Sequence, residues 1–453
     1  MAKDKHKNLV KLGADTLATA LLDLANYSDD ADAVVERLLA SPKETAKSFK
    51  KRLSSFKRRR HFISWGESGA YARELADLLK ALEASESDPK AGVESVAAFF
   101  EADAKIFDMC DDSSGNVGDV FRFDAADLFV SFASCCEDKE WLLELVLALN
   151  RDNGYGVRDV LFEKMSHFLP EELIRQAVDR LWDLAHSQTE KYEGKHWLHA
   201  IDELSKQLKD PQLLEKVKRA ESDGELSTAS IIDIAKLHFE CGDLATALTW
   251  IKRVPLDKSF MAHERDNLLI AIYQGQNNQK KLIETAWRVF RRDRSVDSLE
   301  LLLRAVGEDK RASIVEEEAK SILKAGEFDS SDAGFLIEIG HVDDAETYII
   351  AHANQLNGDF YSSLLELAKA MLKHDRLVAA SVLYRALLNS ILARAKSKYY
   401  HHGISYLKKL DSLAPKVREW KELDPHSLYL QNLRQKHKLK SSFWSQYTPQ
   451  KPS

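Results

Sequence analysis

The feature that most constrains the fold is a pattern that returns at a nearly constant interval between Thr228 and Leu392. In each copy, an apolar helical stripe leads to a tight corner, and a small residue follows five places later. The corners are Gly242, Gly275, Gly307, Gly340 and His374, which lie 33, 32, 33 and 34 residues apart. The small residues are Ala247, Ala312, Ala345 and Ala379, with Lys280 in this place in the second copy. This interval is typical of helix-turn-helix repeats of the tetratricopeptide kind.

The physical basis of the pattern is the way in which two short helices pack. Glycine at a corner adopts a positive φ without steric penalty. A small residue just inside the second helix lets the two backbones approach closely. Each pair can bury only one face alone, so neighbouring pairs must stack, and a curved solenoid is the expected result. The alternative is a generic run of amphipathic helices that happen to have similar lengths.

The rest of the chain is divided by helix-start signals rather than by strand patterns. Acid or hydroxyl residues precede proline at several helix starts, as in Asp88-Pro89 and Asp210-Pro211. No stretch shows convincing strand alternation, so we predict an all-α protein in which tetratricopeptide-like repeats follow an N-terminal helical region and precede a C-terminal helical cap. The expected regions are an N-terminal helical region at 1–125, further helices at 126–227, the repeats at 228–395, the cap at 396–447 and a disordered tail at 448–453.

Composition excludes several classes of protein. The chain has 453 residues, of which 30% are charged, and only 18 Gly and 9 Pro, as expected for a soluble, helix-rich protein. Four cysteines without CxxC spacing do not form a disulfide scaffold or a thiolate zinc site. The N-terminus lacks the features of a signal peptide, and no apolar run reaches the length of a membrane span. We therefore expect a cytoplasmic protein with no membrane segment, metal or other cofactor.

The predicted third helix has the most unusual electrostatics. Between Lys43 and Arg60 there are nine basic residues and one acid, which gives +8 against −15 for the rest of the chain. Phe49, Leu53 and Phe56 form a narrow apolar stripe. A basic helix of this kind can lie along a phosphate backbone. It can equally face an acidic protein surface, or be solvated or paired within the chain. The cations concerned are Lys47, Lys50, Lys51, Arg52, Lys57, Arg58, Arg59 and Arg60.

Two other regions hold residues with possible chemistry. The stretch Asp111–Asp119 resembles a calcium loop, but its turn glycine falls one place late and its twelfth residue, counted from Asp112, is Phe123 rather than an acid. The default interpretation is a capped loop, and Arg158 is expected to form a structural ion pair. Four histidines near the C-terminus show no HExxH spacing, so we interpret them as packed beside aromatic rings. They are His401, His402, His426 and His437.

Several stretches together resemble an uncharacterised bacterial all-α family. They are Arg60–Glu67, Asp111–Gly118, Gly154–Asp159 and the C-terminal series His426, Tyr429, Leu433, His437, Lys440, Phe443 and Trp444. Members of that family are similar to the helical region that accompanies SWIM-type zinc fingers in some longer bacterial proteins. The resemblance spans about residues 10–445. This sequence has no Cys-x-Cys…Cys-x-His finger, so the resemblance implies a fold and a bacterial cytoplasmic setting, but no zinc and no catalytic residue.

Three functions follow from these observations, and the first is favoured. Stacked repeats predict a non-enzymatic scaffold whose concave surface binds a protein or peptide, with Lys236, His238, Arg265 and Asn267 as candidate groove residues. The alternative is a nucleic-acid-associated protein that contacts phosphates through the basic helix 43–60, with affinity that falls steeply as salt increases. The weakest hypothesis is an enzyme with a site among Asp111, Asp112, Arg158 and the C-terminal histidines, because no nucleophile–base pair can be named.

Overall fold

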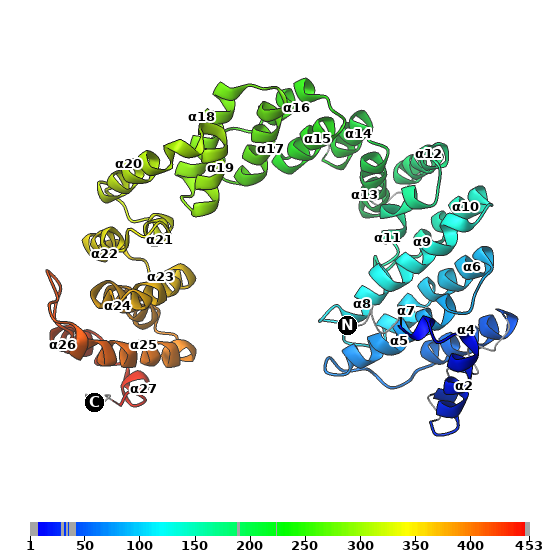
Figure 1. Cartoon of the computed structure of the whole chain (residues 1–453), viewed down its shortest axis with the longest axis horizontal. Helices are drawn as coiled ribbons and strands as arrows, with labels where there is room; N and C mark the ends of the chain where they lie inside the picture. Colours follow the sequence, from blue (N-terminus) through cyan, green and yellow to red (C-terminus); the bar gives the residue numbers. More distant parts are fainter. Residues whose placement is uncertain are drawn as a thin grey trace. The chain divides into compact units, whose positions relative to one another are not determined.

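The computed structural model describes residues 8–28, 31–32, 35, 42–187, 191–222 and 224–448 (Figure 1). Every named element in these ranges is helical, and the one β-type contact there is an isolated bridge between Ile63 and Cys110. The all-α prediction is therefore confirmed for the described residues. Residues 449–453 of the predicted tail lie outside these ranges. The chain divides into two compact units, Met1–Arg253 and Val254–Ser453. The division falls inside the segment predicted as repeats, 228–395.

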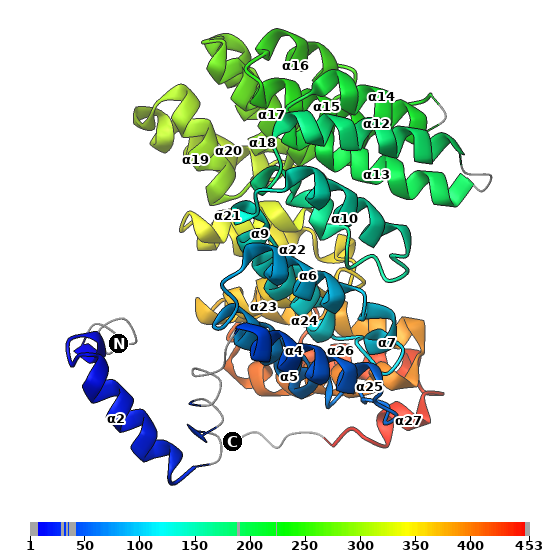
Figure 2. The same ribbon diagram turned by 90° about the vertical axis from the view of Figure 1, so that its right-hand side faces the viewer.

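The first unit opens with helices of mixed length and continues into longer antiparallel helices. Its described elements are α2 (Ala14–Ala25), α4 (Pro42–Lys57), α5 (Ser68–Glu83), α6 (Pro89–Phe100), α7 (Asp103–Phe107), α8 (Asn116–Asp119), the π-helical η1 (Val120–Ala125), α9 (Ala126–Cys135), α10 (Lys139–Arg151), α11 (Val160–Glu163), η2 (Met165–His167), α12 (Glu171–Ser187), α13 (Lys191–Gln207), α14 (Pro211–Glu221), α15 (Thr228–Glu240) and α16 (Leu244–Ile251). From α12 onward, each helix packs against the next, and Figure 2 shows α12 to α15 side by side.

The second unit consists of consecutive helices around one apolar core. Its elements are α17 (Ala262–Gly275), α18 (Gln279–Arg292), α19 (Val296–Val306), η3 (Glu308–Lys310), α20 (Arg311–Leu323), α21 (Ser330–Glu338), α22 (Val342–Ala351), η4 (Ala353–Gln355), α23 (Tyr361–Lys373), α24 (Leu377–Arg394), η5 (Ser397–Tyr399), α25 (Tyr400–Leu413), η6 (Ala414–Lys416), α26 (His426–Lys436) and α27 (Ser441–Trp444). The core extends from Ala286 to Tyr447.

Helix α24 is the central element of the second unit. It packs against α22, α23 and α25, and both Leu383 and Leu388 are completely buried. Among the described helices it is the one with the length and apolar composition to span a membrane, with a mean hydropathy of 1.3. However, 67% of that stretch is buried inside the protein. This burial is what a core helix requires, because its apolar side chains contact neighbouring helices on several sides.

Five helix pairs in the described residues are closed by the same backbone geometry. In each, one residue at the corner has a positive φ. The next residue then donates its backbone N–H to the carbonyl five positions earlier, at 2.8 or 2.9 Å, which is the Schellman closure of a helix. The corner residues are Lys209, Gly242, Asn277, Gly340 and Asp375. These corners lie 33, 35, 63 and 35 residues apart. The long interval contains α19 and α20, which Gly307 and η3 join differently, so the closures describe a helical repeat with one exception.

The predicted corners agree with this geometry in part. Gly242 and Gly340 have φ values of 82° and 84°, as expected, and Gly307 also has a positive φ but leads into the short helix η3 instead. Gly275 is wrong as a corner because it is the last residue of α17, and the positive φ belongs to Asn277. The predicted corner at His374 is also one residue early. Asn and Asp adopt this conformation more readily than other non-glycine residues.

The same closure occurs one pair before the predicted start of the repeats. Lys209 has a φ of 49°, and the Asp210 N–H donates to the Ser205 carbonyl at 2.9 Å. Lys209 precedes Gly242 by 33 residues, so α13 and α14 continue the repeat interval upstream of residue 228. The sequence pattern missed this pair because lysine is not a typical corner residue.

Two glycines in α21 and its corner test whether the positive φ matters to stability. We expect Gly340→Ala to lower the free energy of unfolding by about 1–2 kcal/mol, since an alanine Cβ is strained at φ 84°. Gly334→Ala is the matched control, because Gly334 lies within α21 and an added Cβ there would meet no atom within 4 Å. This control should be neutral or stabilising by up to about 1 kcal/mol. Urea denaturation of both variants measures the difference, and equal effects would contradict the corner geometry.

Candidate functional site

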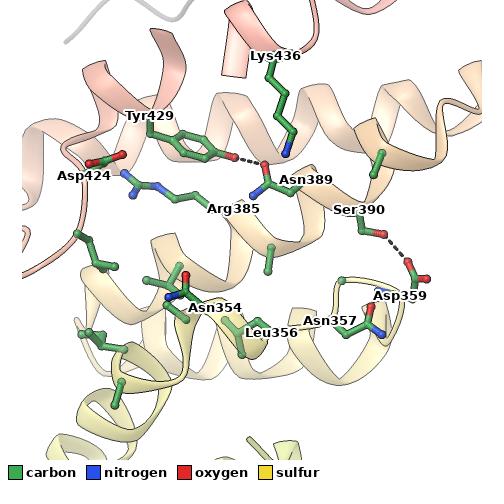
Figure 3. A pocket seen from close by; sticks show the side chains of 18 of the residues that line it. Asn354, Leu356, Asn357, Asp359, Arg385, Asn389, Ser390, Asp424, Tyr429 and Lys436 are labelled. Carbon is green, nitrogen blue, oxygen red and sulfur yellow. Dashed lines mark hydrogen bonds between the residues drawn. The ribbon is translucent and has the colours of Figure 1, made fainter. Parts of the chain in front are cut away.

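A cavity of about 1030 Å³ lies among the described residues of the second unit. It lies between the end of α22 with the loop that follows it, one face of α24, and the C-terminal segment that carries α26 (Figure 3). The lining is polar at several places: Asn354, Asn357, Asp359, Arg385, Asn389, Ser390, Arg394, Glu422, Asp424, Tyr429 and Lys436. Its size lies at the upper end of the range for ligand pockets.

Arg385 is the most unusual residue of this cavity. It is only 8% exposed, and its guanidinium stacks on the rings of Trp420 and Tyr429, at 4.6 and 4.4 Å from their centroids. Within the described chain, its buried Nε and Nη2 atoms have no hydrogen-bond acceptor. Burial lowers the pKa of Arg385, which the nearby Tyr429 and Asp424 partly offset. The rings thus cover the faces of the cation while two donors on its edge remain unsatisfied.

Tyr429 links the C-terminal segment to α24. Its hydroxyl donates to Asn389 Oδ1 at 3.0 Å. Burial raises the pKa of Tyr429, with Arg385 acting in the opposite direction, so the phenol remains protonated and keeps its role as donor. The Asn389 amino group and the exposed Lys436 ammonium have no partner in the described residues, which leaves their hydrogen-bonding capacity available to a ligand.

The loop opposite is held rigidly against α24. A Cβ on Gly358 would clash with the backbone oxygen of Ala386 and lie 2.7 Å from Ser390 Cβ, so only glycine permits this approach. Asp359 then accepts a hydrogen bond from Ser390 Oγ at 2.5 Å and lies 3.4 Å from Arg394 Nε. These contacts engage Asp359 and Arg394 internally. The loop also positions Asn354 and Asn357 on the side of the cavity opposite Asn389 and Lys436 (Figure 3).

The predicted basic helix forms α4 together with the three arginines that follow it; the side chain of Lys43 lies outside the described residues. The stripe of Phe49, Leu53 and Phe56 is buried in the core of the first unit. Arg59 is half-buried, pairs with Glu74 at 3.2 Å and stacks on Tyr71. The other predicted cations are exposed and make no ion pair with described residues: Lys47, Lys50, Lys51, Arg52, Lys57, Arg58 and Arg60. Ion pairs with described residues therefore neutralise only Arg59 among these eight cations.

The predicted groove residues fall in different units and have different surroundings. Lys236 is exposed in the first unit, 3.8 Å from Glu240, whereas His238 is buried there with its Nδ1 3.5 Å from Asp243. Asn267 is exposed in the second unit. Arg265 is 1% exposed and donates to the Pro255 carbonyl, so it has no free edge for a groove ligand.

Arg265 belongs instead to a buried ionic cluster. Asp266, which is completely buried, accepts hydrogen bonds from Arg265 at 3.0 Å, from Arg288 at 2.9 Å and from Arg292. Burial alone would raise the pKa of Asp266, but these three hydrogen bonds outweigh it and hold the pKa below its usual value. The cluster ties α17 to α18, so Arg265 has a structural role that the sequence did not reveal.

Several of the residues considered for catalysis or metal binding are used within the fold. Asp112 accepts from the Val117 and Gly118 N–H groups at 2.8 Å, and Arg158 forms a buried bidentate pair with Asp103 at 2.6 and 2.9 Å. Asp111 accepts a hydrogen bond from Ser113.

Near the C-terminus, His426 Nε2 lies 2.8 Å from Asp411, which also accepts a hydrogen bond from the Tyr447 hydroxyl. Burial and the nearby Lys440 and Lys436 lower the pKa of His437. No three His, Cys, Asp or Glu residues in the described ranges could hold a metal ion together.

Comparison with known proteins gives one family. Residues 4–446 match a family of unknown function, DUF6880. The chain belongs to this family. The expectation of an uncharacterised family that spans most of the chain thus agrees with this match. For this DUF6880 protein, a search of curated proteins finds no similar sequence. A solved circular tandem repeat protein with novel repeat topology and enhanced subunit contact surfaces aligns at 13% identity, covering 94% of this chain and 91% of that one, with a TM-score of 0.15.

Sequence reasoning missed Arg385, although one signal was present. The segment Leu377–Leu392 is apolar apart from a few residues, and Arg385 is its single charged side chain. A lone arginine in a buried helix must be paired, stacked or exposed to a ligand, because an isolated charge in the interior is costly. The residues that stack on it, Trp420 and Tyr429, lie 35 and 44 positions later, so the sequence alone does not bring them together.

Two buried arginines provide a test of the difference between a paired and an unpaired cation. We expect Arg158→Met to lower the free energy of unfolding by roughly 3–5 kcal/mol, because it leaves Asp103 buried without its partner. Arg385→Met should change stability by no more than about 1 kcal/mol, since the loss of ring stacking is offset by removal of two unsatisfied donors. Chemical denaturation of both variants checks this. A large loss for Arg385→Met would mean that Arg385 has a structural partner.

Proposed function

We propose that this protein is a non-enzymatic, tetratricopeptide-like scaffold that binds a segment of a partner protein in the cavity between α22, α24 and α26. The observation that carries the proposal is an open cavity of about 1030 Å³ in which the Asn389 amino group and the Lys436 ammonium have no partner among the described residues. Polar groups that converge on a cavity without partners are available to a ligand. The unpaired Arg385 donors beside them are buried in the wall of the cavity.

The position of the cavity supports the same proposal. Helical repeats use surfaces between consecutive helix pairs to bind extended partners. Here the walls come from two consecutive pairs and the C-terminal segment, so the end of the repeat has a second role besides covering the core. The cytoplasmic and bacterial setting and the relation to the helical region accompanying SWIM-type fingers remain predictions that agree with a scaffold.

A bulky side chain at the cavity tests the scaffold function. Ala393 is exposed and lines the cavity, so Ala393→Trp should fill part of it and lower recovery of a partner at least about tenfold. Ala312→Trp is the matched control and should leave recovery unchanged, because Ala312 is exposed on α20 outside the cavity and not packed between helices as the repeat pattern predicts. The measurement is affinity purification of the tagged full chain from its own cells, with nuclease, followed by quantitative mass spectrometry.

The scaffold proposal fails if no stoichiometric protein survives nuclease treatment, or if Ala393→Trp and Ala312→Trp recover the same partner equally. Circular dichroism of both variants should match that of the original chain. This comparison separates loss of binding from loss of folding.

A second candidate function is binding of nucleic acid through α4 and the arginines that follow it. The specific support is that the apolar stripe of α4 is buried while seven of the eight predicted cations remain exposed without described partners. An exposed row of cations is the electrostatic requirement for sequence-independent contact with phosphates. In this candidate, the fold holds the helix and the exposed cations supply the affinity.

Charge reversal on α4 tests the second candidate. The quadruple change Lys50→Glu, Lys51→Glu, Lys57→Glu and Arg58→Glu should weaken binding to labelled single-stranded and duplex oligonucleotides by at least about tenfold. The control reverses the same number of exposed lysines elsewhere: Lys105, Lys236, Lys252 and Lys280. Fluorescence anisotropy at about 50 and about 200 mM salt should show steep weakening for the unmodified chain and for the control. Equal loss in both variants would exclude α4 as the specific contact.

A further inference from the structure

We infer that the surface formed by α4 and the loop after it, residues 58–67, binds single-stranded nucleic acid, and that the rings of Phe62 and Trp65 stack on its bases. The inference rests on the second candidate function, contact of the α4 cations with phosphates, and names the class of nucleic acid. It adds a contact with bases to the contact with phosphates. The sugar is not read, so strands of DNA and RNA present the same chemistry to this surface.

Trp65 is the most unusual tryptophan of the chain. All eight tryptophans lie in the described ranges, and Trp65 alone is exposed, with 63% of its surface accessible. Phe62, which lies three residues earlier, is 54% exposed. Large apolar rings are normally removed from water, because their burial is favourable. Two exposed rings this close together therefore indicate a surface that contacts another molecule.

The backbone of the loop is held from inside, so that the rings are presented outward. Ile63 is buried, its N–H donates to the Met109 carbonyl at 2.8 Å, and its carbonyl accepts a hydrogen bond from the Asp111 N–H at 2.9 Å. Neighbouring residues of an extended chain point to opposite sides. Burial of Ile63 thus turns Phe62 outward.

The turn that carries Trp65 is closed by side chains. The Glu67 carboxylate accepts hydrogen bonds from the Ser64 N–H at 3.0 Å and from the Ser64 hydroxyl at 2.6 Å. The hydroxyl of Ser68, which is buried, donates to the Trp65 carbonyl at 2.9 Å. Because the backbone around both rings is already ordered, binding costs less conformational entropy than it would in a free loop.

Cations lie directly before the two rings in the chain. Lys57, Arg58 and Arg60 are exposed and make no ion pair with described residues, and they continue the row of exposed cations on α4. Arg60 is two residues before Phe62, so their Cα atoms are at most about 7 Å apart. A single strand therefore meets cations and rings together.

The acids next to the loop are engaged within the fold. Glu67 accepts hydrogen bonds from Ser64, Asp111 accepts one from Ser113, and Asp112 accepts two from backbone N–H groups. The seven exposed cations of α4 and the loop have no such partners among the described residues. The charge that this surface presents to a ligand is therefore mainly positive, as binding of a polyanion requires.

The exposed rings distinguish a single strand from a duplex. Cations alone favour a duplex, whose phosphates are more closely spaced along the axis and whose contacts release more counterions. Stacking has the opposite preference, because the bases of a duplex already stack on one another, whereas those of a single strand have free faces. A surface with two exposed rings beside its cations therefore fits a single strand.

The loop has no free hydroxyl or amide side chain that would read the sugar. The one hydroxyl in residues 57–67, all of which the structure describes, belongs to Ser64 and donates to Glu67. The 2′-hydroxyl is the group that separates RNA from DNA. Strands of DNA and RNA with the same sequence should therefore bind within about fivefold of each other.

The test measures binding of a labelled strand of about 20 nucleotides, alone and annealed to its complement, to the full chain by fluorescence anisotropy. The single strand should bind at least about fivefold more tightly than the duplex at the same salt concentration. Trp65→Ala and Phe62→Ala should each weaken binding of the single strand at least about fivefold and leave binding of the duplex unchanged. Phe260→Ala, which removes a ring that is 61% exposed in the second unit, is the control and should change neither.

Salt dependence separates stacking from charge. Trp65→Ala should lower the affinity but leave the slope of log affinity against log salt concentration unchanged, because no phosphate contact is removed. The charge reversal on α4 should reduce that slope. A merely structural role for Trp65 does not predict this separation.

Tryptophan fluorescence gives a direct readout of stacking. The single strand should quench the fluorescence of the original chain. Trp65→Phe keeps a ring at this place, so it should bind with nearly the original affinity but lose the quenching, since the other seven tryptophans are not exposed.

The inference is overturned if the single strand has no such advantage over the duplex, if Trp65→Ala and Phe62→Ala lose no more affinity than Phe260→Ala, or if one sugar is preferred by more than about fivefold. If the charge reversal on α4 removes binding while both ring variants retain it, the inference is wrong and the second candidate function stands. If no oligonucleotide binds at low salt, both are wrong. A nuclease-resistant protein partner that Trp65→Ala fails to recover would then assign this surface to a protein.

Discussion

The repeated closure of helix pairs depends on one backbone hydrogen bond. At five corners in the described chain, a residue in the left-handed conformation turns the backbone, and the next N–H satisfies a carbonyl that the end of the first helix would otherwise leave without a donor. At three of these corners the residue that donates this N–H then caps the second helix with its side chain: Asp210, Asp243 and Asn278. Because one residue ends one helix and begins the next, the two helices of a pair have little freedom in their relative orientation.

Packing of the second unit follows from those corners. Once α23 and α24 are fixed as a pair, α24 is enclosed by α22, α23 and α25, and its apolar side chains are buried on several faces. The same enclosure takes Arg385 out of water. Its charge is retained because Trp420 and Tyr429 stack on it, but stacking does not satisfy its N–H groups. The buried, ring-stacked cation in the cavity wall is thus a direct consequence of placing one arginine in the central helix α24.

The two kinds of cation in this protein differ in their partners rather than in their burial alone. Arg158 and Arg265 are buried and engaged by carboxylates and carbonyls, so they hold elements together. Arg385 is buried without such acceptors on two of its nitrogens, and all but one of the predicted cations of α4 and its following arginines are exposed without ion pairs in the described chain. Engagement by partners within the fold, and not positive charge as such, therefore separates the arginines that hold elements together from the exposed cations of α4.

The sequence by itself determined the helical class and the corners at Gly242 and Gly340, because these depend on local periodicity and on backbone conformations that few residues adopt. It also identified the basic helix and its apolar stripe, which the structure places in the core. The sequence did not determine the corners at Asn277 and Asp375, where non-glycine residues take the left-handed conformation. Nor did the sequence show that Arg265 is paired with a carboxylate whereas Arg385 is stacked between aromatic rings. Arg265 pairs with its sequence neighbour Asp266, but the other arginines on that carboxylate and the rings that stack on Arg385 come from distant positions. Only the tertiary structure decides these partners, because packing and not a local pattern brings them together.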